Sequence, residues 1–293
     1  MFIDIHAHAY LFPSPPQDGH TQFCTPDEVL AYYDQVGIER GILLPLIGPE
    51  VYLPQSNQEV LEICRCHPDR FSAFCNIDPR GISNTAFTDF SPWLDWFQTH
   101  GVLGVGEFMP NMAFRDPRVL NFFRQVAERH WPLTFDVTTR IGVGYGLVDD
   151  PGLPQLEYCL QKFPAMTILG HGPAFWSEMS VLETIGDRNS YPKYPVHSEG
   201  AVPKLFRRYL NLWGDLSAGS GYNALARDVD NAILFLNEFQ DRLCYGTDYC
   251  YSGGGLPLAE FLLDLRKSGH ISADTFEKIA RRNAIRLLHL PEK

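Results

Sequence analysis

The chain has 293 residues, of which 45% are hydrophobic and 13% aromatic, so it can bury a large core as one α/β barrel domain. Its formal net charge of -11 argues against general binding to nucleic acid or anionic membrane, because phosphate contacts need clustered lysine and arginine. We therefore expect a small-molecule substrate as the partner, and homo-oligomer formation stays open.

The cellular location is predicted from features at the N-terminus and from cysteine usage. The first residues lack a basic region followed by an apolar core and a cleavage site, and no run reaches the roughly 20 apolar residues of a membrane span. Seven cysteines, an odd number, are scattered along the chain, which suits a reducing compartment. These features predict a soluble, cytoplasmic protein.

Strand-like runs alternate with helical patterns along the whole chain. The segment Thr25-Pro26-Asp27-Glu28 combines an N-cap, a proline in the first turn and a capping-box glutamate, and Ser56 with Glu59 predicts a second capping box. Ser91-Pro92 and Asp116-Pro117 indicate two further helix starts. The strand-like runs cover residues 2–5, 41–46, 71–77, 102–108, 133–137, 166–170, 212–216 and 243–246.

Eight such units predict a closed (β/α)8 TIM barrel, which is an α/β fold with a parallel sheet. An open doubly wound sheet is disfavoured, because no glycine-rich phosphate motif follows the first strand. We expect one domain over residues 1–293. The irregular stretch at about 176–200 is predicted to be a lid-like loop, because long loops in compact domains tend to bind ligands.

Two histidines near the start indicate a metal site. His6 and His8 stand two apart at the end of an apolar run that is too short for a helix. On a strand, residues i and i+2 project to the same side, so both imidazoles can face one divalent cation. The pair alone could also arise by chance, so the interpretation depends on the rest of the chain.

Other polar residues end predicted strands in the same way. Since chemistry in a TIM barrel takes place at the carboxyl ends of the strands, these residues are expected to meet. Each could have a purely structural role, but a ring of buried carboxylates and histidines without a cation would be costly. The candidates for this ring are Glu107, Asp136, His171 and Asp248.

Four segments resemble the amidohydrolase superfamily, and more narrowly its second group, which includes aminocarboxymuconate semialdehyde decarboxylase and related decarboxylases. They are Asp-Ile-His-Ala-His at 4–8, Gly-His-Gly at 170–172, Gly-Asp-Leu-Ser at 214–217 and Tyr-Gly-Thr-Asp at 245–248, and residues 277–288 resemble the group's closing helix. The resemblance implies metal ligation by His6 and His8, with His171 as the strand-six histidine. It also implies that Asp248 binds metal and handles protons, and Glu107 matches a strand-four variant of the family.

Asp136 departs from the family pattern, since most members carry a histidine at the end of strand five. Aspartate can bind Zn or Mn through oxygen, but it adds negative charge and favours a harder cation. Zn is the expected metal, with Mn as the alternative. Asp136 is therefore a substitute ligand, a residue that faces the substrate, or a sign of lost catalysis.

The expected mechanism follows from these ligands. A divalent cation lowers the pKa of bound water to about 7 in favourable sites, Asp248 would take the proton, and His171 would orient the water or the carbonyl oxygen. Arg140 could clamp a substrate carboxylate. Tyr145, Trp176 and Tyr222 could stack on a ring, although ordinary packing at the rim explains such residues equally well.

Three functions fit this sequence. The first is a metal-dependent hydrolase that cleaves a C–O or C–N bond, such as a lactone or an amide, in a small carboxylated compound. The second is a non-oxidative metal-dependent decarboxylase or hydratase with the same fold. The third is a catalytically silent barrel with a binding role, because fold does not determine function.

Overall fold

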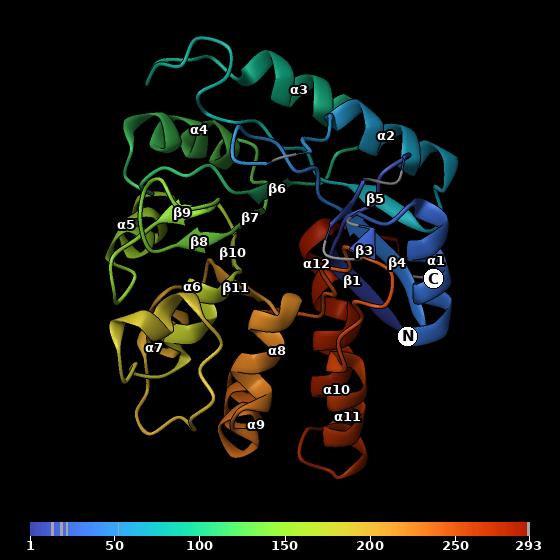
Figure 1. Ribbon diagram of the computed structural model, residues 1–293, viewed down its shortest axis with the longest axis vertical. Coiled ribbons are helices and arrows are strands. Elements are labelled where there is room, and N and C mark those ends of the chain that lie inside the picture. Colours follow the sequence, from blue (N-terminus) through green and yellow to red (C-terminus); the bar gives the residue numbers. More distant parts are fainter. Residues whose placement is uncertain (13–14, 18–19, 22, 52, 292–293) are drawn as a thin grey trace.

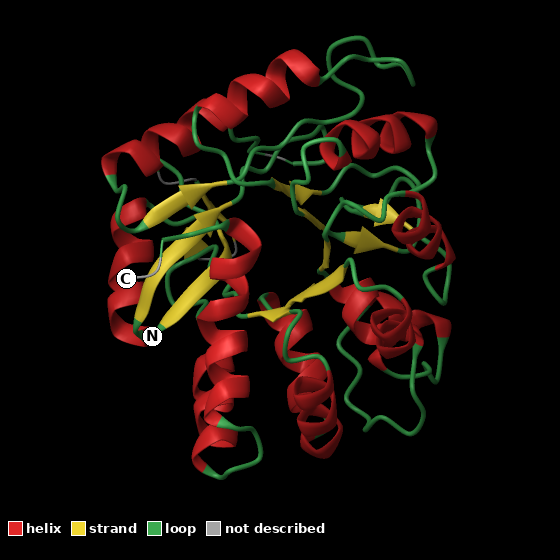
Figure 2. Cartoon of the chain, turned by 180° about the vertical axis from the view of Figure 1, so that it is seen from behind, coloured by secondary structure: helices red, strands yellow, loops and turns green. Residues whose placement is uncertain are grey.

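The structure is a computed structural model that describes residues 1–12, 15–17, 20–21, 23–51 and 53–291. Eight parallel strands surround a common axis, and the helices lie outside them (Figures 1 and 2). In chain order they are β1 (Phe2–Ala7), β4 (Ile38–Leu43), β5 (Phe71–Ala73), β6 (Val105–Phe108), β7 (Leu133–Phe135), β10 (Ile168–Gly170), β11 (Leu212–Asp215) and β12 (Leu243–Cys244).

Backbone hydrogen bonds join the strands into a ring. The ladders run in the orders β1-β4-β5 and β12-β11-β10-β7-β6. On one side the Cys75 N–H donates to the Gly104 carbonyl, and on the other the Ile5 N–H donates to the Tyr245 carbonyl, at 2.9 and 3.0 Å. The Asp248 N–H also donates to the His6 carbonyl at 2.8 Å. The predicted (β/α)8 barrel is confirmed.

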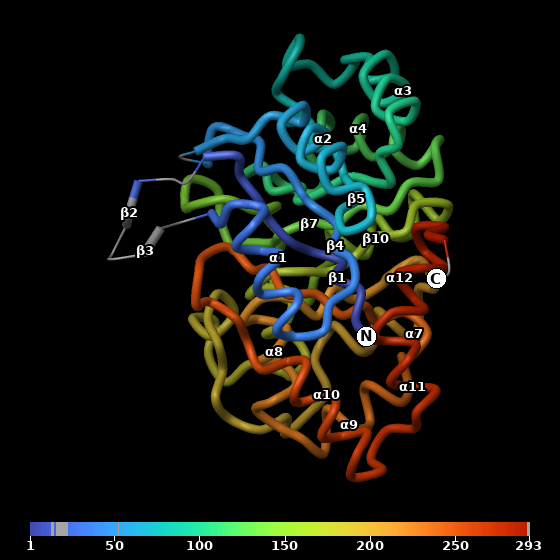
Figure 3. Tube along the Cα trace, turned by 90° about the vertical axis from the view of Figure 1, so that its right-hand side faces the viewer, coloured from blue at the N-terminus to red at the C-terminus, as the bar shows by residue number. Residues whose placement is uncertain are grey.

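Two short strand pairs lie outside the ring. β2 (Pro16–Gln17) and β3 (His20–Thr21) pair antiparallel, while β8 (Val137–Thr138) and β9 (Leu147–Val148) pair parallel. The predicted strand at 133–137 is therefore broken into β7 and β8, and Asp136 lies at the break. Seen from the side, β2 and β3 lie at one end of the barrel, and the N-terminus and α12 lie at the other (Figure 3).

The helices begin largely where the sequence predicted. At Thr25 both halves of the capping box form, because the Glu28 N–H donates to the Thr25 hydroxyl oxygen and the Glu28 carboxylate accepts from the Thr25 N–H. At Ser56 only the first half forms, since the Glu59 carboxylate accepts instead from the Leu11 N–H. The second predicted capping box is therefore only half correct, because the Glu59 carboxylate binds the distant Leu11 N–H and not the N–H of Ser56.

The helical elements are α1 (Pro26–Val36), α2 (Asn57–Cys66), α3 (Ser91–Thr99), α4 (Pro117–Ala127), α5 (Pro154–Lys162), α6 (Pro173–Trp176), η1 (Ser177–Met179), η2 (Ile185–Asn189), α7 (Ala201–Arg208), α8 (Ala218–Ala226), α9 (Val229–Glu238), α10 (Leu258–Lys267), α11 (Ala273–Glu277), η3 (Lys278–Arg282) and α12 (Asn283–Leu288). None in the described part of the chain is long and apolar enough to cross a bilayer.

The described residues form three buried apolar clusters. The largest lies between strands and helices, and the second fills the inside of the barrel with residues such as Ile5, Ile42 and Phe74. Residues of α12, including Ile285 and Leu288, belong to this inner core and close one end of it. The opposite end, where the strands have their carboxyl ends, carries polar side chains beside a small apolar cluster of Tyr10, Phe23, Leu46 and Met109.

The stretch at 176–200 is fastened to the barrel by buried contacts. Arg188 is 1% exposed, and its guanidinium donates to the Glu178 carboxylate and to the Asp149 carbonyl, both at 2.5 Å. Ser180 and Glu199 form a β-bridge across the base of the stretch. The lid-like role of this segment and the single-domain assignment stay predictions.

Candidate metal centre

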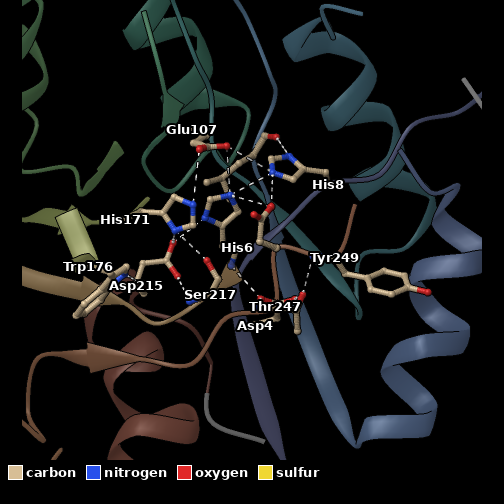
Figure 4. A network of polar contacts seen from close by, with 12 residues as sticks. Asp4, His6, His8, Glu107, His171, Trp176, Asp215, Ser217, Thr247 and Tyr249 are labelled. Atoms are coloured by element: carbon tan, nitrogen blue, oxygen red, sulfur yellow. Dashed lines mark hydrogen bonds and ion pairs between the residues drawn. The ribbon is translucent and has the colours of Figure 1, made fainter. Parts of the chain in front are cut away.

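Polar side chains from six barrel strands meet at the carboxyl ends of the strands. Figure 4 shows His6, His8, Glu107, His171 and Asp215 among them. Seven residues form this group. Six of them are buried and Asp248 is partly exposed, so the group is open to solvent on the side of Asp248. The residues are His6 in β1 and His8 directly after it, Glu107 from β6, Asp136 after β7, His171 after β10, Asp215 at the end of β11 and Asp248 after β12.

Four of these side chains converge closely enough to hold one cation. The Nε2 atoms of His6 and His8 are 3.1 Å apart, and Glu107 Oε2 lies 3.5 and 3.6 Å from them. Asp248 Oδ1 lies 3.8 Å from His6 Nε2 and 3.2 Å from His8 Nε2. Ligands at about 2.1 Å from a tetrahedral zinc ion are roughly 3.4 Å from one another, and these five separations, between 3.1 and 3.8 Å, are close to that value.

The orientation of both imidazoles supports this arrangement. His8 Nδ1 lies 2.8 Å from the Leu44 carbonyl oxygen, and His6 Nδ1 lies 2.6 Å from Asp215 Oδ2. Both Nδ1 atoms therefore carry the hydrogen of a neutral ring, and both Nε2 lone pairs point toward the same space. Two lone pairs 3.1 Å apart repel each other unless a cation or a proton lies between them.

The pKa values show how strongly this position favours positive charge. Burial alone would lower the pKa of His6, but Asp215, Glu107 and Asp248 outweigh it and hold that pKa well above its ordinary value. Burial would likewise raise the pKa of Asp248, but His8, His6 and His171 lower it below the usual aspartate range. A divalent cation would satisfy the same field.

Asp215 is a central residue that the sequence analysis did not assign. It is fully buried, and its Oδ2 contacts His6 Nδ1 at 2.6 Å and His171 Nδ1 at 3.4 Å. The Ser217 N–H donates to Asp215 Oδ1 at 3.0 Å, and the Ser217 hydroxyl lies 3.1 Å from His171 Nδ1. Asp215 thus orients two histidines. Its position at the end of a predicted strand was the signal that could have identified it.

Asp4 is a second residue that was missed. It accepts hydrogen bonds from the His6 N–H at 3.0 Å, the Tyr33 hydroxyl at 2.8 Å, and the Thr247 hydroxyl and N–H at 2.5 and 2.8 Å. Burial raises the pKa of Asp4 to about 6, although these hydrogen bonds oppose the shift. Because it binds β1 to the residue before Asp248, Asp4 sets where that carboxylate lies.

Asp136 lies beside the four-atom centre. One oxygen each from Asp136 and Glu107 and a ring nitrogen of His171 lie within 4.8 Å of one another, so they could also hold an ion. Burial, followed by Glu107 and Asp248, raises the pKa of Asp136 well above the ordinary value. A Cβ on Gly172 would lie 2.2 Å from Asp136 Oδ1, so the glycine of the Gly-His-Gly segment makes room for this carboxylate.

A cavity of about 300 Å³ lies over the centre and is lined by His8, Glu107, Asp136, His171 and Asp248. Of the four residues expected to bind substrate, Tyr145 lines this cavity. The others do not: Arg140 is exposed, and Tyr222 lines a separate hollow. Trp176 is 1% exposed and donates its indole N–H to the Asp215 carbonyl, so the expectation that it stacks on a substrate is corrected.

Among the lining residues that the sequence did not predict are Glu50, Tyr191 and Cys250. Tyr191 belongs to the irregular stretch at 176–200, and Cys250 follows Asp248 by two residues with its Sγ 3.1 Å from Asp248 Oδ1. Glu50 comes from the loop after β4. None of them ends a predicted strand, so a search of strand ends could not find them.

The family model described as Amidohydrolase matches residues 3–290, and the chain belongs to this family. This confirms the resemblance seen in the motifs. The family's members act on small molecules, and the described residues include groups that could hold a metal ion. No curated protein matches the chain.

Solved structures show the same fold at low identity. An uncharacterised TIM-barrel protein from Bordetella bronchiseptica has a TM-score of 0.62 and 19% identity, with 89% of this chain and 81% of that chain covered. A probable 2-pyrone-4,6-dicarboxylic acid hydrolase from Acinetobacter baumannii has a TM-score of 0.59 and 16% identity, with 99% of both chains covered. A 2,6-dihydroxybenzoate decarboxylase from Rhizobium has a TM-score of 0.58 and 18% identity, with 98% of both covered.

Proposed function

We propose that this protein is a metal-dependent hydrolase that cleaves a C–O or C–N bond, such as that of a lactone or an amide, in a small molecule. The observation that supports it is the convergence of His6 Nε2 and His8 Nε2, 3.1 Å apart, on oxygens of Glu107 and Asp248. These four residues would hold the cation, with zinc as the proposed metal because imidazole and carboxylate ligands suit it.

When bound, such a cation would polarise a substrate carbonyl and lower the pKa of water. The chain's own residues would do the rest. Asp248, whose side chain is 22% exposed, would accept a proton from the attacking water and return it to the leaving group. The Asp215 carboxylate and the Ser217 hydroxyl oxygen, 3.4 and 3.1 Å from His171 Nδ1, would both accept from an Nδ1–H, and His171 Nε2 would then orient the attacking water.

The sequence predicted a carboxylated substrate, but the proposed clamp for that carboxylate does not lie at the cavity. This clamp, Arg140, is exposed and is not among the described lining residues of the cavity. The proposed function therefore concerns the bond that is cleaved and does not require a carboxylated substrate.

Metal content is the direct test. The protein would be purified without a metal-binding tag and measured by elemental mass spectrometry as wild type, His6→Ala and Asp136→Ala, with His270→Ala as the control because His270 is exposed on the loop between α10 and α11. We expect about one zinc per chain in the wild type and control, and its loss in His6→Ala. Equal metal in all four proteins, or none after reconstitution, would reject the proposal.

The runner-up reaction, decarboxylation, is distinguished by its products. Hydrolysis places one oxygen atom of labelled water in the product, whereas decarboxylation releases carbon dioxide from a substrate acid. We expect ¹⁸O incorporation with lactone or amide substrates on the metal-loaded protein. Release of carbon dioxide without ¹⁸O incorporation at a cleaved bond would favour the decarboxylase instead.

A further inference from the structure

The cavity over the candidate metal centre is lined by apolar, aromatic and acidic side chains. Its volume of about 300 Å³ is at the small end for ligand sites and fits a molecule of about one ring. Much of the wall is apolar or aromatic and includes Phe23, Leu46, Val51, Met109, Tyr145 and Tyr191.

The charged groups on this wall are acidic. Four carboxyl groups line the cavity, from Glu50, Glu107, Asp136 and Asp248, while the described lining contains no lysine or arginine. The sequence of residues 13–22, part of which is not described, contains neither residue type. A divalent cation would balance the charges of Glu107 and Asp248 but would leave the other two carboxyl groups.

Arg80 contacts this wall through Glu50, but its guanidinium is already paired with two carboxylates. Arg80 donates to both oxygens of Glu50, at 2.6 and 2.7 Å, and to both oxygens of Asp78, at 2.8 and 2.5 Å. Burial would raise the pKa of Glu50, but the bonds from Arg80 hold it below the ordinary value. These two carboxylates take four of the five guanidinium N–H donors of Arg80 and together outweigh its single positive charge, so Arg80 attracts a further anionic ligand only weakly.

From this wall we infer that the site takes a neutral or cationic molecule of about one ring, and that it discriminates against any anionic group other than the one that engages the metal. The inference rests on the proposed function, because it assumes a cation at the centre. A dicarboxylate would therefore be a poor substrate, because its second carboxylate would face Asp136 and Glu50 and would have no cationic partner on the wall.

Two tyrosines supply the contacts that a neutral ligand needs. Asp136, together with burial, Glu107 and Asp248, raises the pKa of Tyr145, so its hydroxyl keeps its hydrogen and can donate to an uncharged oxygen. The ring of Tyr191 lies against Gly219 of α8, where a Cβ on the glycine would be 3.5 Å from it. The two rings offer flat apolar surface on which an uncharged ring can pack.

Four metal-binding probes of one shape test the inference. Benzohydroxamic acid and its 4-carboxamide, 4-carboxylate and 4-aminomethyl derivatives would be titrated by calorimetry into the zinc-loaded protein. We expect the 4-carboxylate to bind at least about tenfold more weakly than the 4-carboxamide, and the 4-aminomethyl compound to bind at least as tightly as the carboxamide. A carboxylate that binds as tightly as the carboxamide would overturn the inference.

A pair of variants checks the electrostatic cause. Val51 is partly exposed at the cavity wall, so Val51→Lys would introduce a cation and Val51→Met would add similar length without charge. The ratio of carboxylate to carboxamide affinity should rise at least about tenfold in Val51→Lys relative to Val51→Met. An unchanged ratio would contradict the inference. If the parent hydroxamate does not bind the zinc-loaded wild type, the metal centre itself is wrong and the inference falls with it.

Discussion

The two ends of the barrel differ sharply although the same strands build both. At one end, Ile3 and Ile5 of β1 pack with Leu288 of α12 in an apolar core. One residue further along β1, His6 is equally buried but contacts a histidine and three carboxylates. The comparison teaches that stability and chemistry are separated along the strand direction, so each end can be perturbed with little effect on the other.

The largest effect on stability is expected at the apolar end. Ile42 is fully buried among the residues that fill the barrel, so Ile42→Ala should lower the free energy of unfolding by about 2–5 kcal/mol. Chemical denaturation would measure it. Zinc content at low temperature should stay at the wild-type level, and loss of zinc from the still folded variant would show that the two ends are not independent.

The next effect is a pH dependence from the polar end. Asp149 follows β9 and accepts from the N–H groups of Asp150, Gln155 and Leu156, yet burial raises its pKa from 3.8 to about 6. The folded state therefore holds the proton more tightly than the unfolded chain. Its contribution to stability is complete below about pH 4 and falls as pH rises through about 6, by at most about 3 kcal/mol.

Unfolding free energies of wild type and Asp149→Asn at several values between pH 4 and 7 would test this. Asp4 titrates in the same range, so the difference between the two proteins isolates the contribution of Asp149. We expect the wild type to lose more stability than the variant across this range. Parallel curves would show that Asp149 keeps an ordinary pKa in the folded protein.

A smaller effect is expected from the residue that orients the histidines. Asp215→Asn keeps the shape but removes the charge that holds His6 Nδ1–H at 2.6 Å, so zinc affinity should fall about 10-fold to 100-fold. Competition with a chelator measures the affinity. Asp241→Asn, at an exposed position near the end of α9, is the matched control and should bind zinc as the wild type does.

The smallest effect is expected where the two regions meet. Tyr33 of α1 donates to Asp4 at 2.8 Å from outside the barrel, and Tyr33→Phe removes only that hydroxyl. Stability should fall by about 1 kcal/mol, since a hydrogen bond to a charged or buried acceptor is lost. Thermal unfolding would detect it, and a variant as stable as the wild type would mean that the Thr247 donors alone satisfy Asp4.

Much of the fold could be predicted because its signals are local. The eight strands and the helix starts depend on apolar runs and on caps within a few residues, and all eight strands are present with shifted ends. Glu59 shows the limit of such signals. Glu59 is close to Ser56 in the sequence, but its carboxylate accepts a hydrogen bond from the N–H of Leu11, which is 48 residues away.

The candidate site was only partly predictable. Side chains at strand ends, such as His6, Glu107 and His171, are brought together as the rule for barrels requires. Arg140 and Trp176 were judged by residue type, and the packing of loops decided otherwise: one is exposed, and the other is enclosed beneath Asp215.

The strand and helix pattern, the family, and the residue types at the carboxyl ends of the strands could all be predicted from the amino-acid sequence, because each depends on spacing along the chain. Long-range packing places Asp215 between two histidines, joins Asp4 of β1 to the segment before Asp248, and pairs Arg80 with Glu50. These relations join residues 30 to 243 positions apart, and such contacts exist only once the barrel has closed.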